Sequence, residues 1–224
     1  MEGKPKHMNE LEILARKYGT DKRNNDPGQS IYHGYTDAYY KYMFPRKHDI
    51  KNLLEIGVRE GYSHSMWADF LPNAKIYGID NFSDPACSVS KEEIESNPKI
   101  KVIVGDQSDK DTTRKFEDIP LDIIIDDGSH MSWHQQKSFD LLWDYLLLGG
   151  YYFIEDLAVC YERKFREFDN ARSSTLDWLQ TIKNGIIPFS YYIKEERMNE
   201  IFNQFETISS FGELFIIQKS RETY

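Results

Sequence analysis

The stretch NLLEIGVREGYSH, residues 52–64, decides the fold of this 224-residue chain. It joins a continuously apolar run to a corner that holds two glycines, Gly57 and Gly61, and then to a helix-like segment at 63–71. The same order recurs in AKIYGID (74–80), IKVIVGD (100–106), LDIIIDDG (121–128) and GYYFIED (150–156), each with an acidic or glycine-rich corner. Continuously apolar strands that alternate with helices predict a mostly parallel α/β sheet covered by helices on both faces.

The segments on either side of this pattern predict a helical cap and a hairpin. Apolar periodicity predicts helices at 9–18, with Asn9 as the cap, and at 36–44, 91–96, 111–117, 132–148 and 172–183. Residues 202–218 favour two strands around a Ser-Phe-Gly turn, so we expect an antiparallel hairpin to close one edge of the sheet. Repeats and linkers are absent from the sequence, which indicates a single domain over 1–224.

Composition and charge argue against several classes of protein. The chain carries 28 basic and 37 acidic residues, a net charge of −9 at pH 7, whereas domains that bind nucleic acid through its phosphates are usually basic. The sequence contains neither an apolar run long enough to span a membrane nor a recognisable secretory signal. Two cysteines are too few for a disulfide scaffold or a four-thiolate zinc site. We therefore expect a cytoplasmic protein without a nucleic-acid or membrane partner.

The first three corners of the predicted sheet carry residues that suit a nucleoside. The glycines at 57 and 61 allow the backbone to approach a ligand, and Ser63 can cap the following helix or bind a carboxylate. Asp80 ends the second strand, where a carboxylate can accept both hydroxyls of a ribose. Asp106 follows the third strand, within reach of an adenine amino group. These corners fit NAD and S-adenosylmethionine equally, and the alternative is a set of tight turns without a ligand.

The last two corners place up to four carboxylates at one edge of the sheet. Asp126 and Asp127 end one buried strand, and Glu155 and Asp156 end the next. Neighbouring strands lie about 5 Å apart, so unpaired anions there would repel one another and raise each other's pKa. Neither motif contains a lysine or arginine to neutralise them, which favours a hard divalent cation such as Mg²⁺ or Ca²⁺. The alternative is a set of solvated carboxylates beside helix N-termini.

Two histidines follow the first of these acidic corners. His130 stands three residues after Asp127, and a histidine beside a metal and a cofactor is a natural general base. His134 lies one helical turn further on, and we interpret it as a packed or capping residue because the zinc-binding H-E-x-x-H pattern is absent.

Together, LLEIGVREGYS, YGID, VGD, IIIDDGSH and GGYYFIED resemble the class I S-adenosylmethionine-dependent methyltransferases. More narrowly, they resemble the metal-dependent sugar O-methyltransferases of macrolide biosynthesis, the MycE and TylF group. The leader KYGTDK (17–22) and the segment from His33 to Tyr35 are also similar to that group. The resemblance covers roughly residues 11–160, while the tail after residue 160 departs from it.

The resemblance implies a Rossmann-like class I methyltransferase fold in three parts. These are an N-terminal helical cap or lid (1–45), a cofactor-binding core (46–160), and acceptor-side and sheet-edge elements (161–224). It also implies roles for particular residues. The methionine end of the cofactor would contact Glu55, Gly57 and Ser63. Its ribose would contact Asp80, its adenine would contact Asp106 and Gln107, and the lid would supply Tyr18, Thr20 and Lys22. Mg²⁺ would bind Asp127, Glu155 and Asp156, with Asp126 as a fallback, and His130 would be the general base.

The expected function is therefore S-adenosylmethionine- and Mg²⁺-dependent O-methylation of a vicinal diol. The acceptor would be a sugar in a glycoside natural product or a surface polysaccharide. Three alternatives remain open: a small non-sugar hydroxyl acceptor, an NAD-dependent oxidoreductase, and a non-catalytic cofactor-binding protein. The aromatic segment 31–44 fits either contact with the acceptor or contact with a second copy in a homo-oligomer.

Overall fold

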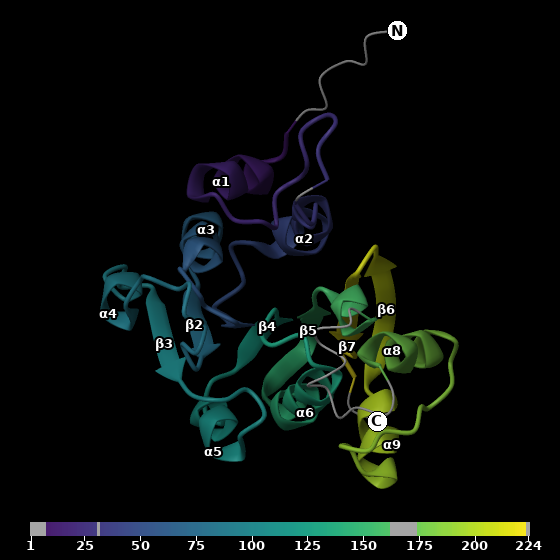
Figure 1. The fold of residues 1–224 in the computed structure, drawn as a ribbon. Helices are drawn as coiled ribbons and strands as arrows, with labels where there is room; N and C mark the ends of the chain where they lie inside the picture. The colour runs from purple at the N-terminus through teal and green to yellow at the C-terminus, as the bar shows by residue number, and fades with distance from the viewer. Residues whose placement is uncertain (1–7, 31, 162–173, 223–224) are drawn as a thin grey trace, which may run out of the picture.

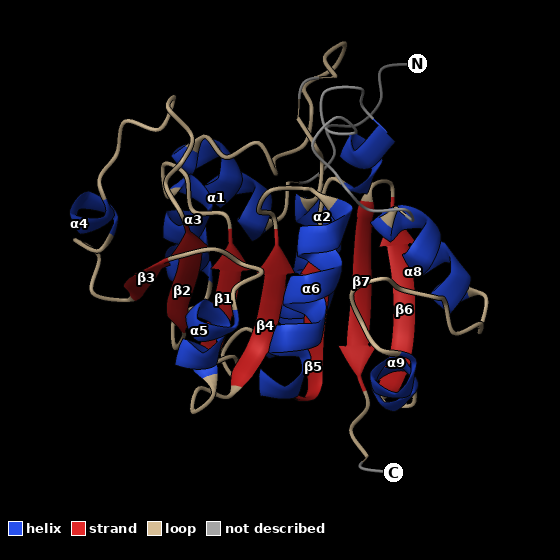
Figure 2. Cartoon of the chain, turned by 60° about the horizontal axis from the view of Figure 1, so that its bottom comes forward, coloured by secondary structure: helices blue, strands red, loops and turns tan. Residues whose placement is uncertain are grey.

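The computed structural model describes residues 8–30, 32–161 and 174–222, and seven strands of this part form one sheet (Figures 1 and 2). The strands are β1 (Asn52–Ile56), β2 (Lys75–Asp80), β3 (Ile100–Val104), β4 (Leu121–Asp126), β5 (Leu146–Ile154), β6 (Phe205–Phe211) and β7 (Leu214–Lys219). Their order across the sheet is β3-β2-β1-β4-β5-β7-β6. The first five pair in parallel, whereas β7 runs antiparallel to β5 and to β6. The predicted parallel sheet and its C-terminal hairpin are both confirmed.

Helices cover both faces of this sheet (Figure 1). The α-helices are α1 (Glu10–Tyr18), α2 (Thr36–Met43), α3 (Tyr62–Phe70), α4 (Lys91–Ile94), α5 (Lys110–Thr113), α6 (Ser132–Leu142), α8 (Thr175–Lys183) and α9 (Glu195–Phe202). Single 3₁₀ turns are η1 (Phe44–Arg46), η2 (Arg114–Phe116), η3 (Trp143–Tyr145) and η4 (Leu157–Tyr161). None of the helices in the described ranges is both long and apolar enough to cross a membrane.

Two apolar cores lie on opposite faces of the sheet. Alternate strand residues enter each core, because successive side chains of a strand point to opposite faces. Leu53, Ile123 and Phe153 pack with α1, α2 and α3 on one face. Leu54 and Ile124 pack with α6, α8 and α9 on the other. The continuous apolar runs of the sequence therefore arise because both faces of the strands are buried.

Several predicted boundaries differ from the structure by a few residues, and those near the C-terminal hairpin differ for clear reasons. The helix predicted to continue to Leu148 ends earlier, because the chain turns at η3 and β5 begins at Leu146, which pairs with Leu121. The strand predicted from Phe202 begins at Phe205, since residues before it form α9. The hairpin turns at Gly212, which has a φ of +60°, while Ser210 and Phe211 still belong to β6. The start of the helix predicted at 172 lies outside the described residues.

The buried carboxylate of Glu12 connects three parts of the N-terminal segment through hydrogen bonds. The Asn9 side chain accepts a hydrogen bond from the Glu12 amide, which confirms it as the cap of α1. The Glu12 carboxylate is 1% exposed and accepts hydrogen bonds from the Arg16 guanidinium at 2.6 Å, the Asn24 amide at 2.9 Å and the Thr36 hydroxyl at 2.6 Å. Glu12 thus joins α1, the loop that follows it and the start of α2.

Candidate active site

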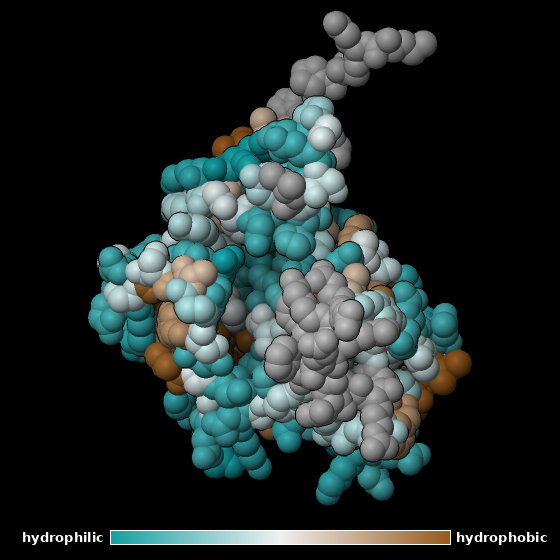
Figure 3. Space-filling view, viewed as in Figure 1, coloured by the Kyte–Doolittle hydropathy of each residue, from teal (hydrophilic) through white to brown (hydrophobic). Residues whose placement is uncertain are grey.

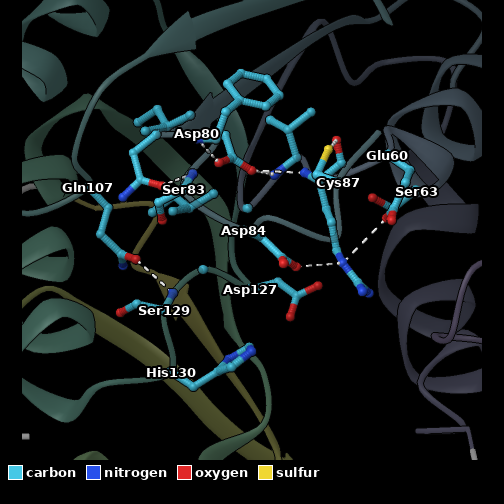
Figure 4. A pocket seen from close by; sticks show the side chains of 18 of the residues that line it. Glu60, Ser63, Asp80, Ser83, Asp84, Cys87, Gln107, Asp127, Ser129 and His130 are labelled. Carbon is cyan, nitrogen blue, oxygen red and sulfur yellow. Dashed lines mark hydrogen bonds and ion pairs between the residues drawn. The ribbon is translucent and has the colours of Figure 1, made fainter. Parts of the chain in front are cut away.

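A cavity of about 550 Å³ opens at the carboxyl edge of the parallel strands. Its wall consists of the loops that follow β1 to β5, together with residues 19–22 of the N-terminal loop. Figure 3 shows hydrophilic residues around the hollow at the centre of this face, and Figure 4 shows side chains that line the cavity. Ligands of open α/β sheets bind at this edge, and the volume suits a small organic cofactor.

The glycine corner after β1 allows the loop after β4 to approach it closely. Gly57 has a φ of +88°, and a Cβ atom there would lie 2.1 Å from the carbonyl oxygen of Asp127. Gly57 and Ser63 both line the cavity. The Ser63 hydroxyl donates to the Glu55 carboxylate at 2.8 Å instead of capping α3. Glu55 itself is fully buried behind the cavity wall, so it meets a ligand only through such neighbours.

Asp80 holds the first two corners together. One of its oxygens accepts hydrogen bonds from the Val58 and Arg59 amides at 2.7 and 2.8 Å, and the other accepts from the Phe82 amide at 2.6 Å. The carboxylate still lines the cavity, as Figure 4 shows. A carboxylate oxygen offers two lone pairs, so the oxygen bonded to Phe82 keeps one acceptor position for a ribose hydroxyl.

Gln107 and Asp126 connect the corners after β3 and β4. The Gln107 amide nitrogen donates to Asp126 at 3.1 Å, and its amide oxygen accepts from the Ser129 amide at 3.0 Å. Asp126 is fully buried and also accepts from the Ser138 hydroxyl at 2.6 Å. The fallback ligand Asp126 is therefore turned toward α6 and lies outside both groups of side chains that could hold a metal ion. Asp106, in contrast, lines the cavity with a side chain that is 44% exposed.

The remaining carboxylates converge as expected, but a lysine from outside both motifs lies among them. The Lys22 ammonium is 2.5 Å from Asp127, 2.8 Å from Glu155 and 3.2 Å from Glu55. Its side chain is 1% exposed. Neither acidic motif contains a lysine or arginine, as noted from the sequence, but the N-terminal loop supplies one. Lys22 also lines the cavity, where it was expected over the cofactor, and its ammonium lies within the acidic group.

Asp156 has a separate set of partners. His33 lies 3.0 Å from one of its oxygens, and the Tyr35 hydroxyl donates to the same oxygen at 2.8 Å. The other oxygen is 4.0 Å from Nε2 of His130. Asp156 and His130 both line the cavity. Tyr39, fully buried, donates its hydroxyl proton to Glu155, which lies behind the wall.

Burial and mutual repulsion shift the pKa values of these carboxyl groups. Burial raises the pKa of Asp127 to about 6, although the Lys22 charge opposes that shift. Burial also raises the pKa of Glu155 well above its usual range, and the charge of Asp127 adds to this. Burial would raise the pKa of Asp156 as well, but the hydrogen bond from His33 and the nearby histidine charges lower it to about 2. A further positive charge close to Asp127 and Glu155 would therefore favour their ionised forms.

Within the described ranges, four residues other than glycine have a left-handed backbone, and all four line the cavity. They are Arg59 (φ +48°), Phe82 (φ +51°), His130 (φ +58°) and Asp156 (φ +55°). Such conformations are uncommon for residues with a Cβ atom and cost roughly 1–3 kcal/mol each. Because all four surround one cavity, their backbone strain is concentrated where the positions of the lining side chains matter most.

The other sequence-derived candidates divide between the cavity and the surface. Thr20 lines the cavity. Tyr18 does not, because its hydroxyl donates to Asp69 at 2.6 Å on the exposed side of α1. His134 lines the cavity and its Nδ1 lies 2.6 Å from the Ser129 hydroxyl, so it helps to order the loop after β4.

The sequence interpretation missed Tyr39 and did not foresee the contacts of His33 and Tyr35. Their signal was present in the aromatic segment 31–44, which was expected to meet an acceptor or another subunit. Tyr35 and Tyr39 instead turn inward to the acidic corner after β5.

The donor set fits one divalent metal ion beside the lysine. Ligand atoms of Asp127, His130 and Asp156 lie within 4.8 Å of one another, and so do those of Glu55, Asp127 and Glu155. Lys22 is bonded to all three carboxylates of the second group, so the first group is the one open to a metal. Oxygen-rich donors on a cavity wall with excess negative charge are suited to Mg²⁺.

The strand order, the antiparallel C-terminal hairpin and the cavity at the carboxyl edge define a class I methyltransferase fold. Residues 54–157 match the family model of a methyltransferase domain. The solved structure of the MycE methyltransferase of the mycinamycin pathway, in complex with Mg and S-adenosylhomocysteine, superimposes with a TM-score of 0.75 at 25% identity. The match covers 96% of this chain and 56% of that chain.

Two curated relatives are sugar O-methyltransferases. The 8-demethyl-8-α-L-rhamnosyl tetracenomycin-C 2′-O-methyltransferase of Streptomyces olivaceus is 30% identical over 77% of this chain and 44% of that protein. The mycinamicin VI 2″-O-methyltransferase of Micromonospora griseorubida is 32% identical over 68% of this chain and 37% of that protein. The chain thus spans less than half the length of the curated relatives it matches. It is a homologue of the sugar O-methyltransferases of glycosylated natural products.

Proposed function

We propose that this chain is an S-adenosylmethionine- and Mg²⁺-dependent O-methyltransferase that acts on a sugar hydroxyl of a glycosylated natural product. One observation carries the proposal: a cavity of cofactor size has Asp80 on one wall and Asp127, Asp156 and His130 on another. A nucleoside cofactor, a metal ion and a base can therefore meet in one space. Relatives that methylate rhamnosyl and macrolide sugars support the class of acceptor.

The charge of the cavity favours S-adenosylmethionine over a dinucleotide. The wall carries seven carboxylates and two side chains that stay cationic, which are Lys22 and Arg59. A cationic sulfonium is attracted by such a field, whereas a diphosphate is repelled. S-Adenosylmethionine supplies a methyl group on that sulfonium and leaves as a neutral thioether.

The cofactor would be bound by the residues at the first three corners. Gly57 lets the backbone approach it, Asp80 would accept from its ribose, and Asp106 would meet its adenine. Ser63 and Thr20 line the cavity near the first corner and the lid. Gln107 lines the cavity beside Asp106 and would also meet the adenine, whereas Glu55 would act from behind the wall through the hydrogen bond that it accepts from Ser63.

The metal and the base would share the work of activating the acceptor. Asp127 and Asp156 line the cavity and are the metal ligands that this proposal favours. Glu155 lies behind the cavity wall and forms an ion pair with Lys22. Mg²⁺ there would orient two neighbouring hydroxyls and lower the pKa of the one to be methylated. His130 would take the hydroxyl proton as the oxygen accepts the methyl group, because its ring lies on the wall beside Asp156.

Two measurements test the proposal in sequence. Calorimetric titration with S-adenosylhomocysteine, with and without Mg²⁺, should give micromolar binding, and NAD should give none. Methyl transfer is then measured by mass spectrometry with an aryl rhamnoside and with catechol as acceptors. Transfer to the rhamnoside that disappears in EDTA supports the proposal. Binding of NAD alone, or transfer to catechol alone, would contradict it.

A further inference from the structure

The ammonium of Lys22 fills a position where three carboxylates could hold a metal ion. The carboxylates of Glu55, Asp127 and Glu155 offer ligand atoms that all lie within 4.8 Å of one another. Lys22 contacts every member of this group, and it reaches both oxygens of Glu155, at 2.8 and 2.9 Å. An ammonium at the centre of three carboxylates takes the place that a divalent cation takes in metal sites of similar donors.

A second cation position adjoins the first and shares Asp127 with it. Asp127, His130 and Asp156 also have ligand atoms within 4.8 Å of one another, and the two carboxylates of this group are the metal ligands favoured above, with His130 beside them as the base. Unlike Glu55 and Glu155, the side chains of this group face the cavity. The two positions together therefore form one centre, with an inner position held by Lys22 and an outer position that a dissolved ion can reach.

Neighbouring groups hold Lys22 and its carboxylates in place. The Lys22 carbonyl oxygen accepts hydrogen bonds from the Tyr35 amide at 2.9 Å and the Thr36 amide at 3.2 Å, which fix the loop to the start of α2. The Trp67 indole donates to Glu55 at 3.0 Å, and the Tyr39 hydroxyl donates to Glu155. Since the Lys22 side chain is 1% exposed, an ion from solvent cannot reach the inner position while Lys22 occupies it.

The balance of charge explains why the outer position still needs a cation. Glu55, Asp127, Glu155 and Asp156 contribute four negative charges when all are ionised, Lys22 contributes one positive charge, and His33, 3.0 Å from Asp156, contributes a second when it is protonated. The excess is close together and largely buried, which is unfavourable without a further cation. A lysine that served only to neutralise a buried carboxylate would need one partner, whereas this one touches three.

We propose that Lys22 is the built-in second cation of a two-cation centre, a positioning residue that fixes Asp127 and Glu155 and limits the centre to a single divalent ion. The inference rests on the proposed function for the presence of that ion in the outer position. The segment that carries Lys22 also lines the cavity through Thr20 and Asp21, so the N-terminal loop contributes to both the cavity wall and the metal site.

Counting bound Mn²⁺ tests this role. Equilibrium dialysis with elemental analysis, and the electron paramagnetic resonance spectrum, would be recorded for the full chain and for Lys22→Ala, Lys22→Arg and Lys17→Ala. The last is a matched control, because Lys17 is exposed and pairs with Asp69 on the surface. Lys22→Ala should bind one more Mn²⁺ per chain than the unsubstituted protein, with a spectrum broadened by coupling between two ions. Lys22→Arg and Lys17→Ala should show no gain.

The difference in count separates this inference from the proposed function. If the unsubstituted chain binds no Mn²⁺, the metal in the proposed function fails, yet a gain of one ion in Lys22→Ala still supports Lys22 as an internal cation. An unchanged count in Lys22→Ala would overturn the inference. If that variant folds only with Mn²⁺ present, the dependence of its unfolding on Mn²⁺ should exceed that of the unsubstituted chain by one ion. Failure to fold at any Mn²⁺ concentration would also overturn it, since an ion in the inner position must restore the missing charge.

Discussion

Replacement of Glu12 by glutamine should loosen the N-terminal loop without touching the cavity directly. One Glu12 oxygen accepts from Arg16, and the other accepts from both the Asn24 amide and the Thr36 hydroxyl. A glutamine keeps the shape of the side chain but turns one of these acceptors into an NH₂ donor. At least one of the three donors must then lose its acceptor in a site where Glu12 is 1% exposed.

The expected cost follows from the kind of bond that is lost. A hydrogen bond that involves a charged group contributes about 1.5–3 kcal/mol, and a buried donor left without an acceptor costs about 1–3 kcal/mol. We therefore expect Glu12→Gln to lower the free energy of unfolding by about 2–3 kcal/mol. For a domain of this length, that corresponds to a fall in Tm of about 4–12 °C. Affinity for S-adenosylhomocysteine should fall too, because the loosened loop supplies Thr20, Asp21 and Lys22 to the cavity.

Urea unfolding and calorimetric binding would measure the two effects side by side. Glu10→Gln is the matched control, because Glu10 lies on the same helix and its side chain is 45% exposed beside Lys47. Exposed ion pairs contribute about 0–1 kcal/mol, so this variant should unfold almost as the unsubstituted chain does. If the two variants lie within about 0.5 kcal/mol of each other, Glu12 does not tether the loop, and this reasoning is refuted.

Three further outcomes are expected. His130→Asn, chosen because asparagine tolerates the left-handed backbone, should lower kcat about 10²- to 10⁴-fold while affinity for S-adenosylhomocysteine stays nearly unchanged; equal losses in both would mean a structural role. Gly57→Ala should lower the free energy of unfolding, measured in urea, by about 3 kcal/mol or more, because the new Cβ atom meets the Asp127 carbonyl. Gly212→Ala is the control, because Gly212 is also left-handed but lies in open space, and it should lower that free energy by about 1–2 kcal/mol. Similar losses in the two variants would rule out the close approach at Gly57. Burial lowers the pKa of His64, so below a pH of about 6.5 the unfolded chain binds a proton that the folded chain does not bind, and stability falls as the pH falls. His64→Gln should therefore lose less stability than the unsubstituted chain between pH 7.5 and 5.5. Equal losses would exclude His64 as the cause.

The sheet could be predicted from the sequence because its determinants are local. Each parallel strand is a short apolar run that ends at a glycine or an acidic residue, and this pattern can be recognised within about seven residues. The helix predicted through Leu148 failed for the same reason. The apolar residues before it continue a helical period, and only the pairing of Leu146 with Leu121, across the sheet, decides that a strand begins there.

The candidate site was predictable at the strand ends and not beyond them. Asp127 and Asp156 followed from topology, since parallel strands bring their carboxyl ends to one edge. The bond from Lys22 to Asp127 spans 105 positions, and no periodicity connects a loop lysine to a strand that distant. Charge balance could have provided a hint, because buried carboxylates require a cation, but it could not say which one.

The four left-handed residues around the cavity have a consequence for attempts to engineer this protein. Glycine or asparagine at Arg59, Phe82, His130 or Asp156 would relieve the backbone, so screens for heat resistance should enrich such substitutions at these positions. Two of the four, His130 and Asp156, also carry the proposed chemistry. Variants selected for heat resistance at these two positions should therefore gain thermal stability and lose turnover. A variant that gains stability and keeps its turnover must carry its substitutions away from the carboxyl edge of the sheet.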